Sequence, residues 1–250
     1  MLTLEHIHKH YGSLCAADDV TLELADGESL VLAGESGSGK TTLAKIAAGV
    51  LAPDRGRVLL DGRPLAPLCR RRSFDQCAGI QYIFQDPYGA LDPGFTVRRA
   101  LDEPARICRR RGRAFLPAEE ALFYVGLSDF LDRPLGELSG GQRQKVCIAR
   151  ALMPLPRLII ADESTAMLDR QSGLDVFDLL NRIKDEKGVS LLVILHDVDF
   201  SYARWDRIAV MRQGKIVEQA RFAGFRSSAS HPYSRDLLAA YDFFNRRDPS

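Results

Sequence analysis

The chain has 250 residues, of which 46% are hydrophobic and 27% charged, a balance typical of globular proteins. Its 34 basic and 33 acidic residues leave a formal net charge of +1, so no overall positive field favours nucleic acid. No apolar run has the length of a membrane span or a signal-peptide core, and we expect a cytosolic protein with one core and an inserted subdomain. The five cysteines are scattered without metal-ligand spacing, so we expect reduced thiols.

Short segments rich in Val, Ile and Leu alternate with segments of helical periodicity, which predicts an α/β domain with a largely parallel sheet. The predicted strands are 20–24, 29–34, 79–84, 157–162, 190–195 and 207–212. The Asp26-Gly27 pair between the first two strands is typical of a hairpin turn. We therefore expect an antiparallel N-terminal edge.

The strand pattern stops between residues 86 and 139, where helical stretches are punctuated by Pro and Gly. This predicts a helical subdomain over about 86–153, inserted into a core formed by about 1–85 and 155–220. We expect one domain over 1–238 and a C-terminal tail over 239–250. Gly188 is expected to end the helix that precedes the strand at 190–195.

The stretch "GESGSGKTT" follows an apolar strand and precedes a helical pattern, so it satisfies G-x-x-x-x-G-K-[ST] in the required context. Its glycines let the backbone curl so that N–H groups face phosphate oxygens at the positive end of the helix. A Gly/Ser-rich connecting loop is the alternative, but the flanking elements disfavour it. The candidate nucleotide-binding residues are Gly34, Glu35, Ser36, Gly37, Ser38, Gly39, Lys40, Thr41 and Thr42.

Within this loop, Lys40 is expected to contact the β- and γ-phosphates of ATP, and the Thr41 hydroxyl is expected to bind Mg²⁺. Asp162 and Glu163 follow another apolar strand, at the sheet edge where ligands of parallel sheets bind. We expect Asp162 to hold Mg²⁺ through its water shell and Glu163 to orient or deprotonate the attacking water. Ordinary solvated strand-end residues are the alternative.

His196 ends the apolar strand "VIL" and is expected to donate a hydrogen bond to the γ-phosphate, with a purely structural histidine as the alternative. A second glycine pair occurs in "ELSGGQRQK", 137–145. There Ser139 can cap a helix while Gly140 and Gly141 leave backbone N–H groups uncovered at its start. An ordinary helix start is again the alternative.

In their order, "GESGSGKT", "LSGGQ", "LIIADE" and "LHD" resemble the ATP-binding subunits of ABC transporters, over about Leu2 to Leu238. The resemblance implies an ATPase that uses ATP and Mg²⁺. It implies a P-loop NTPase core with a mainly parallel sheet, an N-terminal antiparallel β subdomain and an inserted α-helical subdomain. Two such subunits face each other head to tail, so the residues of one that contact the γ-phosphate held by the other would be Ser139, Gly140, Gly141 and Gln142.

The same resemblance implies that Tyr11 stacks on adenine, with a strand-edge tyrosine as the alternative. It implies that Gln85 senses Mg²⁺ and the attacking water and links the site to the helical subdomain. Asp169 matches the aspartate of the loop that crosses between subunits. Two departures, Ser164 for the usual Pro and Met167 for a small residue, leave the shape of that loop open.

"QDPYGALDP", 85–93, and "HPYSRDLL", 231–238, resemble stretches of the ATPases that energise oligopeptide and nickel import. This implies a peripheral protein at the cytoplasmic membrane face, serving import of peptides, nickel or metal chelates. Its expected partners are a second ATPase subunit, in a heterodimer or alternatively a homodimer, two integral-membrane permease subunits and an extracytoplasmic binding protein. Without clustered cysteines, no iron-sulfur centre is expected.

Two rival functions stay open at this point. One is a soluble ABC ATPase of an enzyme complex such as phosphonate breakdown. The other is a nucleic-acid or ribosome-associated ABC protein, which the single cassette and the absence of a long coiled-coil insertion disfavour. The arginine runs at 70–72 and 109–113 indicate solvated faces, with contact to membrane-subunit loops or lipid as the alternative.

Overall fold

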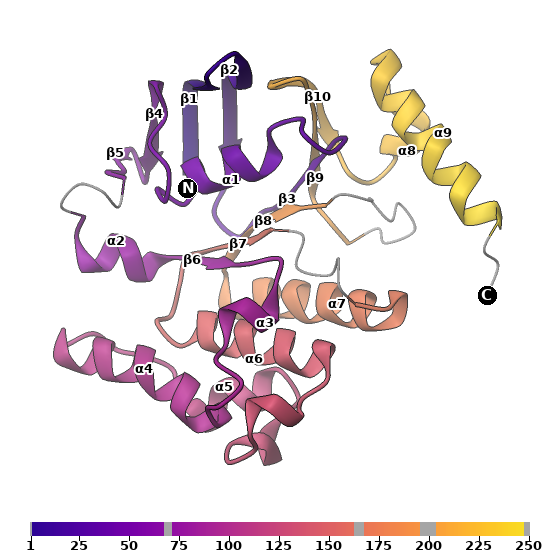
Figure 1. Ribbon diagram of the computed structural model, residues 1–250. Helices are drawn as coiled ribbons and strands as arrows, with labels where there is room; N and C mark the ends of the chain where they lie inside the picture. The colour runs from indigo at the N-terminus through magenta and orange to yellow at the C-terminus, as the bar shows by residue number, and fades with distance from the viewer. Residues whose placement is uncertain (1, 68–71, 163–167, 196–203, 248–250) are drawn as a thin grey trace. The chain divides into compact units, whose positions relative to one another are not determined.

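The computed structural model describes residues 2–67, 72–162, 168–195 and 204–247, and side chains as far as residue 241. The chain forms two compact units. Unit 1 combines Met1–Arg71 with Leu192–Ser250, and unit 2 is Arg72–Leu191 (Figure 1). The polypeptide therefore leaves unit 1, forms unit 2 and then returns.

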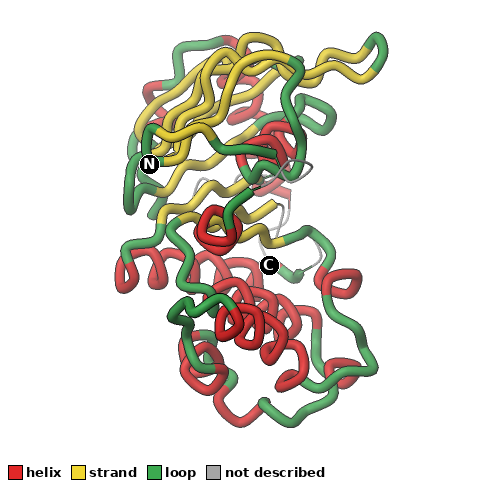
Figure 2. The backbone as a smooth tube through the Cα atoms, turned by 90° about the vertical axis from the view of Figure 1, so that its left-hand side faces the viewer, coloured by secondary structure: helices red, strands yellow, loops and turns green. Residues whose placement is uncertain are grey.

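Unit 1 contains an antiparallel sheet in the order β2-β1-β4-β5, seen among the yellow strands of Figure 2. Its strands are β1 (Leu2–Tyr11), β2 (Leu14–Leu24), β4 (Arg55–Leu60) and β5 (Arg63–Pro64). Along the second half of β2, buried and exposed residues alternate, as in a sheet with one solvated face. Helix α1 (Lys40–Ala47) contacts this sheet at β2.

The other strands of unit 1 bring the C-terminal part of the chain beside the N-terminal part. Strand β3 (Ser29–Ala33) is buried over its whole length and runs parallel to β9 (Arg207–Arg212). Strand β10 (Lys215–Arg221) pairs antiparallel with β9. The chain then forms α8 (Phe225–Ser228) and α9 (Pro232–Arg247), so residues 239–247 of the expected tail are helical.

The predicted hairpin at Asp26-Gly27 is wrong. Strand β2 pairs with β1, whereas β3 belongs to the other sheet. The reason lies in burial: β3 is apolar on both faces and takes a parallel partner, while half of β2 faces solvent. The expected antiparallel N-terminal region is present, but β1 supplies its pairing.

Unit 2 is mainly helical. It contains α2 (Phe74–Gly79), α3 (Pro87–Ala90), α4 (Val97–Arg110), α5 (Ala118–Tyr124), α6 (Gly140–Leu152) and α7 (Arg170–Lys187), with short 3₁₀ turns at Ser128–Phe130 and Leu135–Glu137. Helix α6 is central, since α3, α4, α5 and α7 all pack on it. Gly188 ends α7 with a φ of +65°, as predicted.

Unit 2 also holds the parallel strands β6 (Ile80–Ile83) and β7 (Leu158–Asp162). Strand β8 (Ser190–Ile194) begins in unit 2, where Ser190 N donates to Arg157 O at 2.9 Å, and it ends in unit 1. The predicted fold class is therefore confirmed. Across the described ranges, none of the helices combines the length and the hydropathy needed to cross a membrane.

Candidate functional site

The glycine-rich loop at residues 34–42 of unit 1 accepts only glycine at two of its positions. Gly34 has a φ of +148°, and a Cβ there would lie 2.1 Å from the Met211 carbonyl oxygen. Gly39 has a φ of +106°, and its Cβ would lie 2.0 Å from the Ala16 carbonyl oxygen. Both neighbours are backbone atoms that cannot turn aside. The loop therefore packs closely against the backbones of β9 and β2 at these two glycines.

Lys40 lies inside this loop and is only 4% exposed. Its Nζ donates to the carbonyl oxygens of Gly34 at 2.7 Å and of Glu35 at 2.9 Å. Helix α1 starts at this lysine, and its N-cap Gly39 has no side chain to satisfy the helix N–H groups. Ser38 is 1% exposed, and its hydroxyl has no hydrogen-bond partner among the described residues.

These features fit a polyphosphate. Buried positive charge, the start of a helix and glycines that a Cβ would block are what a phosphate-binding loop requires. Tyr11, at the end of β1, is 49% exposed, with Lys9 Nζ 5.7 Å from its ring centre. An exposed aromatic face of this kind can stack on a base.

In unit 2, β7 ends at Asp162, which is 6% exposed. Tyr82 on β6 donates its hydroxyl hydrogen to Asp162 Oδ2 at 2.5 Å, which holds the carboxylate in one orientation. Carboxylate and hydroxyl oxygens are ligand types that Mg²⁺ prefers, so Asp162 within unit 2 and Thr41 within unit 1 each carry a donor that suits the ion. Glu163 and His196 lie outside the described residues, as do the departures Ser164 and Met167.

The Ser-Gly-Gly segment forms the start of α6, as predicted. Gln142 N donates to Ser139 Oγ at 3.3 Å, and Ser139 N donates to Gln142 Oε1 at 3.0 Å, a reciprocal capping box. The glycines are not crowded. A Cβ at Gly140 would lie 3.4 Å from the Tyr88 hydroxyl oxygen, and one at Gly141 would lie 3.6 Å from Ser172, both ordinary contacts.

The start of α7 lies next to the start of α6. This is seen at Gly141 of α6, where an added Cβ would lie 3.6 Å from Ser172 of α7. Asp169 is the N-cap of α7 and accepts hydrogen bonds from Ser172 N at 3.0 Å and Ser172 Oγ at 2.6 Å. The bond from the Ser172 hydroxyl is the main cause that lowers the pKa of Asp169. Two helix starts and a carboxylate are thus placed side by side within unit 2.

Gln85 lies two residues after the end of β6 and is exposed. Phe84 before it is 53% exposed, and Asp86 after it caps α3 by accepting from Tyr88 N at 2.8 Å. The capped turn holds the segment that carries Gln85.

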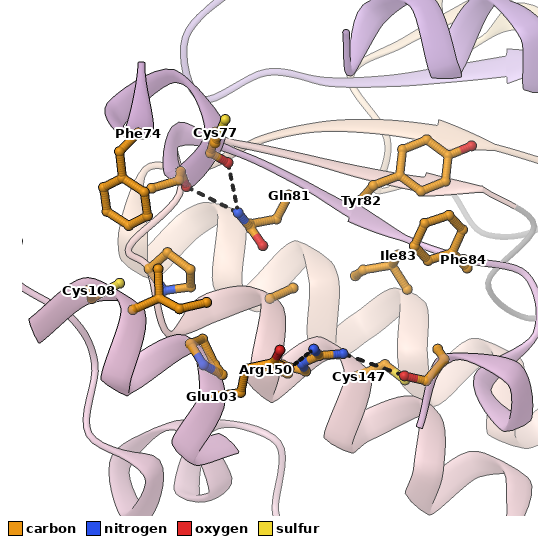
Figure 3. Close-up of a pocket in the computed structure, with 16 residues that line it drawn as sticks. Phe74, Cys77, Gln81, Tyr82, Ile83, Phe84, Glu103, Cys108, Cys147 and Arg150 are labelled. Carbon is orange, nitrogen blue, oxygen red and sulfur yellow. Dashed lines mark hydrogen bonds and ion pairs between the residues drawn. The ribbon is translucent and has the colours of Figure 1, made fainter. Parts of the chain in front are cut away.

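A hollow of about 390 Å³ in unit 2 was not predicted from the sequence (Figure 3). It lies between β6 with α2 on one side and α4 with α6 on the other, and Phe84 and Ile107 contribute exposed apolar surface. The ion pair between Arg150 and Glu103 is part of its lining. Burial raises the pKa of the Cys147 thiol to about 11, so this lining residue stays protonated.

The predicted residues thus fall into two groups. Tyr11 and residues 34–42 belong to unit 1, whereas Gln85, Asp162, 139–142 and Asp169 belong to unit 2. The grouping is not apparent in the sequence, because Gln85 follows the loop of unit 1 more closely than it precedes Asp169.

Comparisons with known proteins show the family and the fold of the chain. The family model described as ABC transporter matches residues 17–166. A Brucella ovis protein whose name describes a peptide import ATP-binding protein is 36% identical over 96% of this chain and 78% of its own length. The nickel import ATP-binding protein NikE of Rhodospirillum rubrum is 37% identical over 89% of this chain and 81% of its own length.

Solved structures show the same fold. The ADP conformation of MJ1267, an ATP-binding cassette of an ABC transporter, superposes with a TM-score of 0.80 at 28% identity, over 96% of this chain and 98% of that one. The dimeric structure of MJ0796, a bacterial ABC transporter cassette, superposes with a TM-score of 0.73 at 28% identity, over 89% and 99%.

Proposed function

Because this chain belongs to the ABC transporter family, we propose that it is the ATP-binding and ATP-hydrolysing subunit of an importer for peptides, nickel or metal chelates. The observation that carries the proposal is the loop at residues 34–42. Gly34 and Gly39 of this loop are sterically required, and Lys40 is buried with its Nζ bonded to backbone carbonyls. Relatives named for peptide and nickel import favour this function over the ATPase of a soluble enzyme complex.

Hydrolysis would depend mainly on positioning and charge. Lys40 would exchange its carbonyl partners for phosphate oxygens, and Thr41 with Asp162 would hold Mg²⁺, which would offset charge developing on the phosphates. Glu163 would orient a water for in-line attack on the γ-phosphorus and accept the proton that this water loses. The bond to the bridging oxygen breaks, and ADP and inorganic phosphate leave. His196 would donate a hydrogen bond to the γ-phosphate, and Gln85 would sense Mg²⁺ and the attacking water.

A substitution of the expected base tests this chemistry. Glu163→Gln should leave MgATP binding intact while nearly abolishing ATP hydrolysis, because the amide cannot accept a proton from water. Lys40→Ala is the matched control that should lose binding itself. Normal turnover in Glu163→Gln would contradict the proposal.

We also propose that residues 139–142 complete the ATP site of a second ATPase subunit. Three observations support this: a capped helix start, glycines that the chain does not crowd, and a related cassette solved as a dimer. Ser139→Arg should leave ATP binding by the isolated chain nearly unchanged yet block ATP-driven dimer closure. Ser128→Arg, another exposed serine of unit 2, is the control. Loss of ATP binding by the Ser139→Arg monomer would contradict the assignment.

The full assembly we propose contains a second, different ATPase chain, two permease subunits at the cytoplasmic membrane face and an extracytoplasmic binding protein. Affinity purification from membranes tests it. Integral-membrane partners support import, whereas a soluble lyase complex would support the rival enzyme-complex function.

Within that assembly, we place the permease contact at the hollow of unit 2. Its exposed Phe84 directly precedes Gln85, so a permease segment seated there would lie next to the residue expected to sense Mg²⁺ and the attacking water. Ile107→Asp should reduce co-purification with the permeases without changing ATP binding by the isolated chain. Phe123→Asp, which alters a 71% exposed residue of α5 outside the hollow, should not. Equal effects of the two variants would contradict this placement.

A further inference from the structure

We propose that Tyr233 of α9 is a positioning residue of the phosphate loop, whose hydroxyl fixes the Gly34–Glu35 peptide and so sets how tightly the chain binds ATP. The inference rests on the proposed ATP-binding function. It gives a physical role to "HPYSRDLL", which the sequence shows only as a mark of a subfamily.

The peptide unit between Gly34 and Glu35 is held at both of its polar ends. Glu35 N donates to the Tyr233 hydroxyl oxygen at 2.8 Å. The carbonyl oxygen of the same peptide, on Gly34, accepts from Lys40 Nζ at 2.7 Å. The tyrosine and the lysine thus contact one rigid amide plane from opposite sides.

This double contact matters because Gly34 does not fix the peptide by itself. Without a Cβ, glycine allows rotations that other residues resist. An N–H that is already hydrogen-bonded also makes its own carbonyl a better acceptor, so the Tyr233 bond strengthens the hold on Lys40. Without Tyr233, the peptide can turn, and both the carbonyl and the lysine lose their orientation.

Tyr233 is itself held in place. It is 8% exposed, and the Arg212 guanidinium lies 4.7 Å from its ring centre. The segment before it is anchored to β10, since Glu218 accepts from Ser230 N at 2.7 Å, Ser230 Oγ at 2.9 Å and His231 N at 3.2 Å. The hydroxyl is therefore presented by a braced helix start rather than by a loose tail.

The ionisation states suit this role. Burial is the main cause that raises the pKa of Tyr233, so the group stays a neutral phenol that places no negative charge beside phosphates. Burial would also raise the pKa of Glu218, but its hydrogen bonds, from Ser230 N first, outweigh burial and lower that pKa to about 2. At neutral pH the anchor is charged and fully able to accept.

The test removes one oxygen. Tyr233→Phe keeps the ring but leaves Glu35 N–H without its partner, and equilibrium titration of the full chain with a fluorescent ATP analogue measures the result. We expect the Kd to rise about 3- to 10-fold, the effect of one net hydrogen bond. The KM for ATP should rise likewise, with kcat within about two-fold. Tyr241→Phe removes a hydroxyl from the same helix and should change neither.

A purely structural role would give a different pattern: a lower melting temperature and a lower kcat, with unchanged KM and Kd. That pattern, or binding by Tyr233→Phe equal to that of the unsubstituted chain, overturns the inference. Glu218→Gln should raise Kd in the same direction by less, and its combination with Tyr233→Phe should be less than additive because both act through one helix start. If the effects of the two substitutions on Kd are fully additive, Glu218 does not act through Tyr233.

Failure of the proposed function would look different. If the unsubstituted chain does not bind the ATP analogue, the function fails, and this inference fails with it. If the chain binds, Lys40→Ala abolishes binding and Tyr233→Phe has no effect, only the role of Tyr233 is wrong.

Discussion

The loop at residues 34–42 and the helix start at residues 139–142 are both rich in glycine and serine, but the space around their glycines differs. In the loop, a Cβ on Gly34 or Gly39 would strike a backbone carbonyl at 2.1 or 2.0 Å. At the helix start, a Cβ on Gly140 or Gly141 would find ordinary contacts of 3.4 to 3.6 Å. The first glycines are demanded by the chain's own fold.

The helix ends differ in the same way. Helix α1 has no side-chain cap, which leaves its start to a ligand, whereas α6 is capped reciprocally by Ser139 and Gln142. A preformed loop needs no partner to take shape. The fold of this chain does not require glycine at positions 140 and 141. A requirement for glycine there would come from a molecule that binds at this helix start.

The largest expected effect is that of Gly39→Ala. A Cβ at a φ of +106° and 2.0 Å from a carbonyl should destabilise the loop by about 3 kcal/mol or more. Titration with a fluorescent ATP analogue should show binding weakened by roughly 100-fold or more. Unchanged binding would mean that the loop is not the nucleotide site.

An intermediate effect is expected at low pH, where protonation of Glu218 should weaken its hydrogen bonds to Ser230 and His231. Because the pKa of Glu218 is lowered to about 2, its contribution is complete above its ordinary value of 4.5 and is lost as pH falls toward 2. Hydrogen exchange at Ser230 and His231, corrected for intrinsic rates, should increase over that range. Glu218→Gln should cost about 1–2 kcal/mol at neutral pH and flatten this dependence. A pH response that survives the substitution assigns it to another group.

Loss of the cap on α6 should be smaller. Ser139→Ala removes the acceptor for Gln142 N and should lower the free energy of unfolding by about 1 kcal/mol. Urea unfolding followed by circular dichroism measures it. Ser139→Asp, which can still cap, should recover most of the loss, and failure to do so would argue against the capping box.

The smallest effect on stability should come from Gly141→Ala. The methyl group fits, so the free energy of unfolding should change by no more than about 0.5 kcal/mol, and the isolated chain should bind ATP normally. ATP-driven dimerisation, followed by light scattering, should nevertheless weaken. If dimerisation is unaffected, the glycine pair does not face a partner's phosphate.

Much of the fold follows from local pattern. The buried strands β3, β7, β8 and β9 were predicted because each is an apolar run, and the loop at 34–42 because its glycines and lysine stand between strand and helix. Strands β1, β4, β5 and β10 were missed. In β1 and β10, polar residues such as His, Lys, Glu and Gln interrupt the apolar pattern. The incorrect prediction of a hairpin at Asp26-Gly27 has a related cause. Turn residues indicate where the chain bends, but not which strand the following segment pairs with.

The sequence by itself determined the fold class, the candidate ATP site and the family, because periodicity and glycine-rich motifs are local properties of the chain. Only the tertiary structure decided that Tyr233 reaches Glu35 across 198 positions of sequence, that Tyr82 holds Asp162 and that unit 2 contains a hollow. Each of these depends on side chains brought together by sheet pairing and helix packing, whose long-range geometry no local pattern encodes.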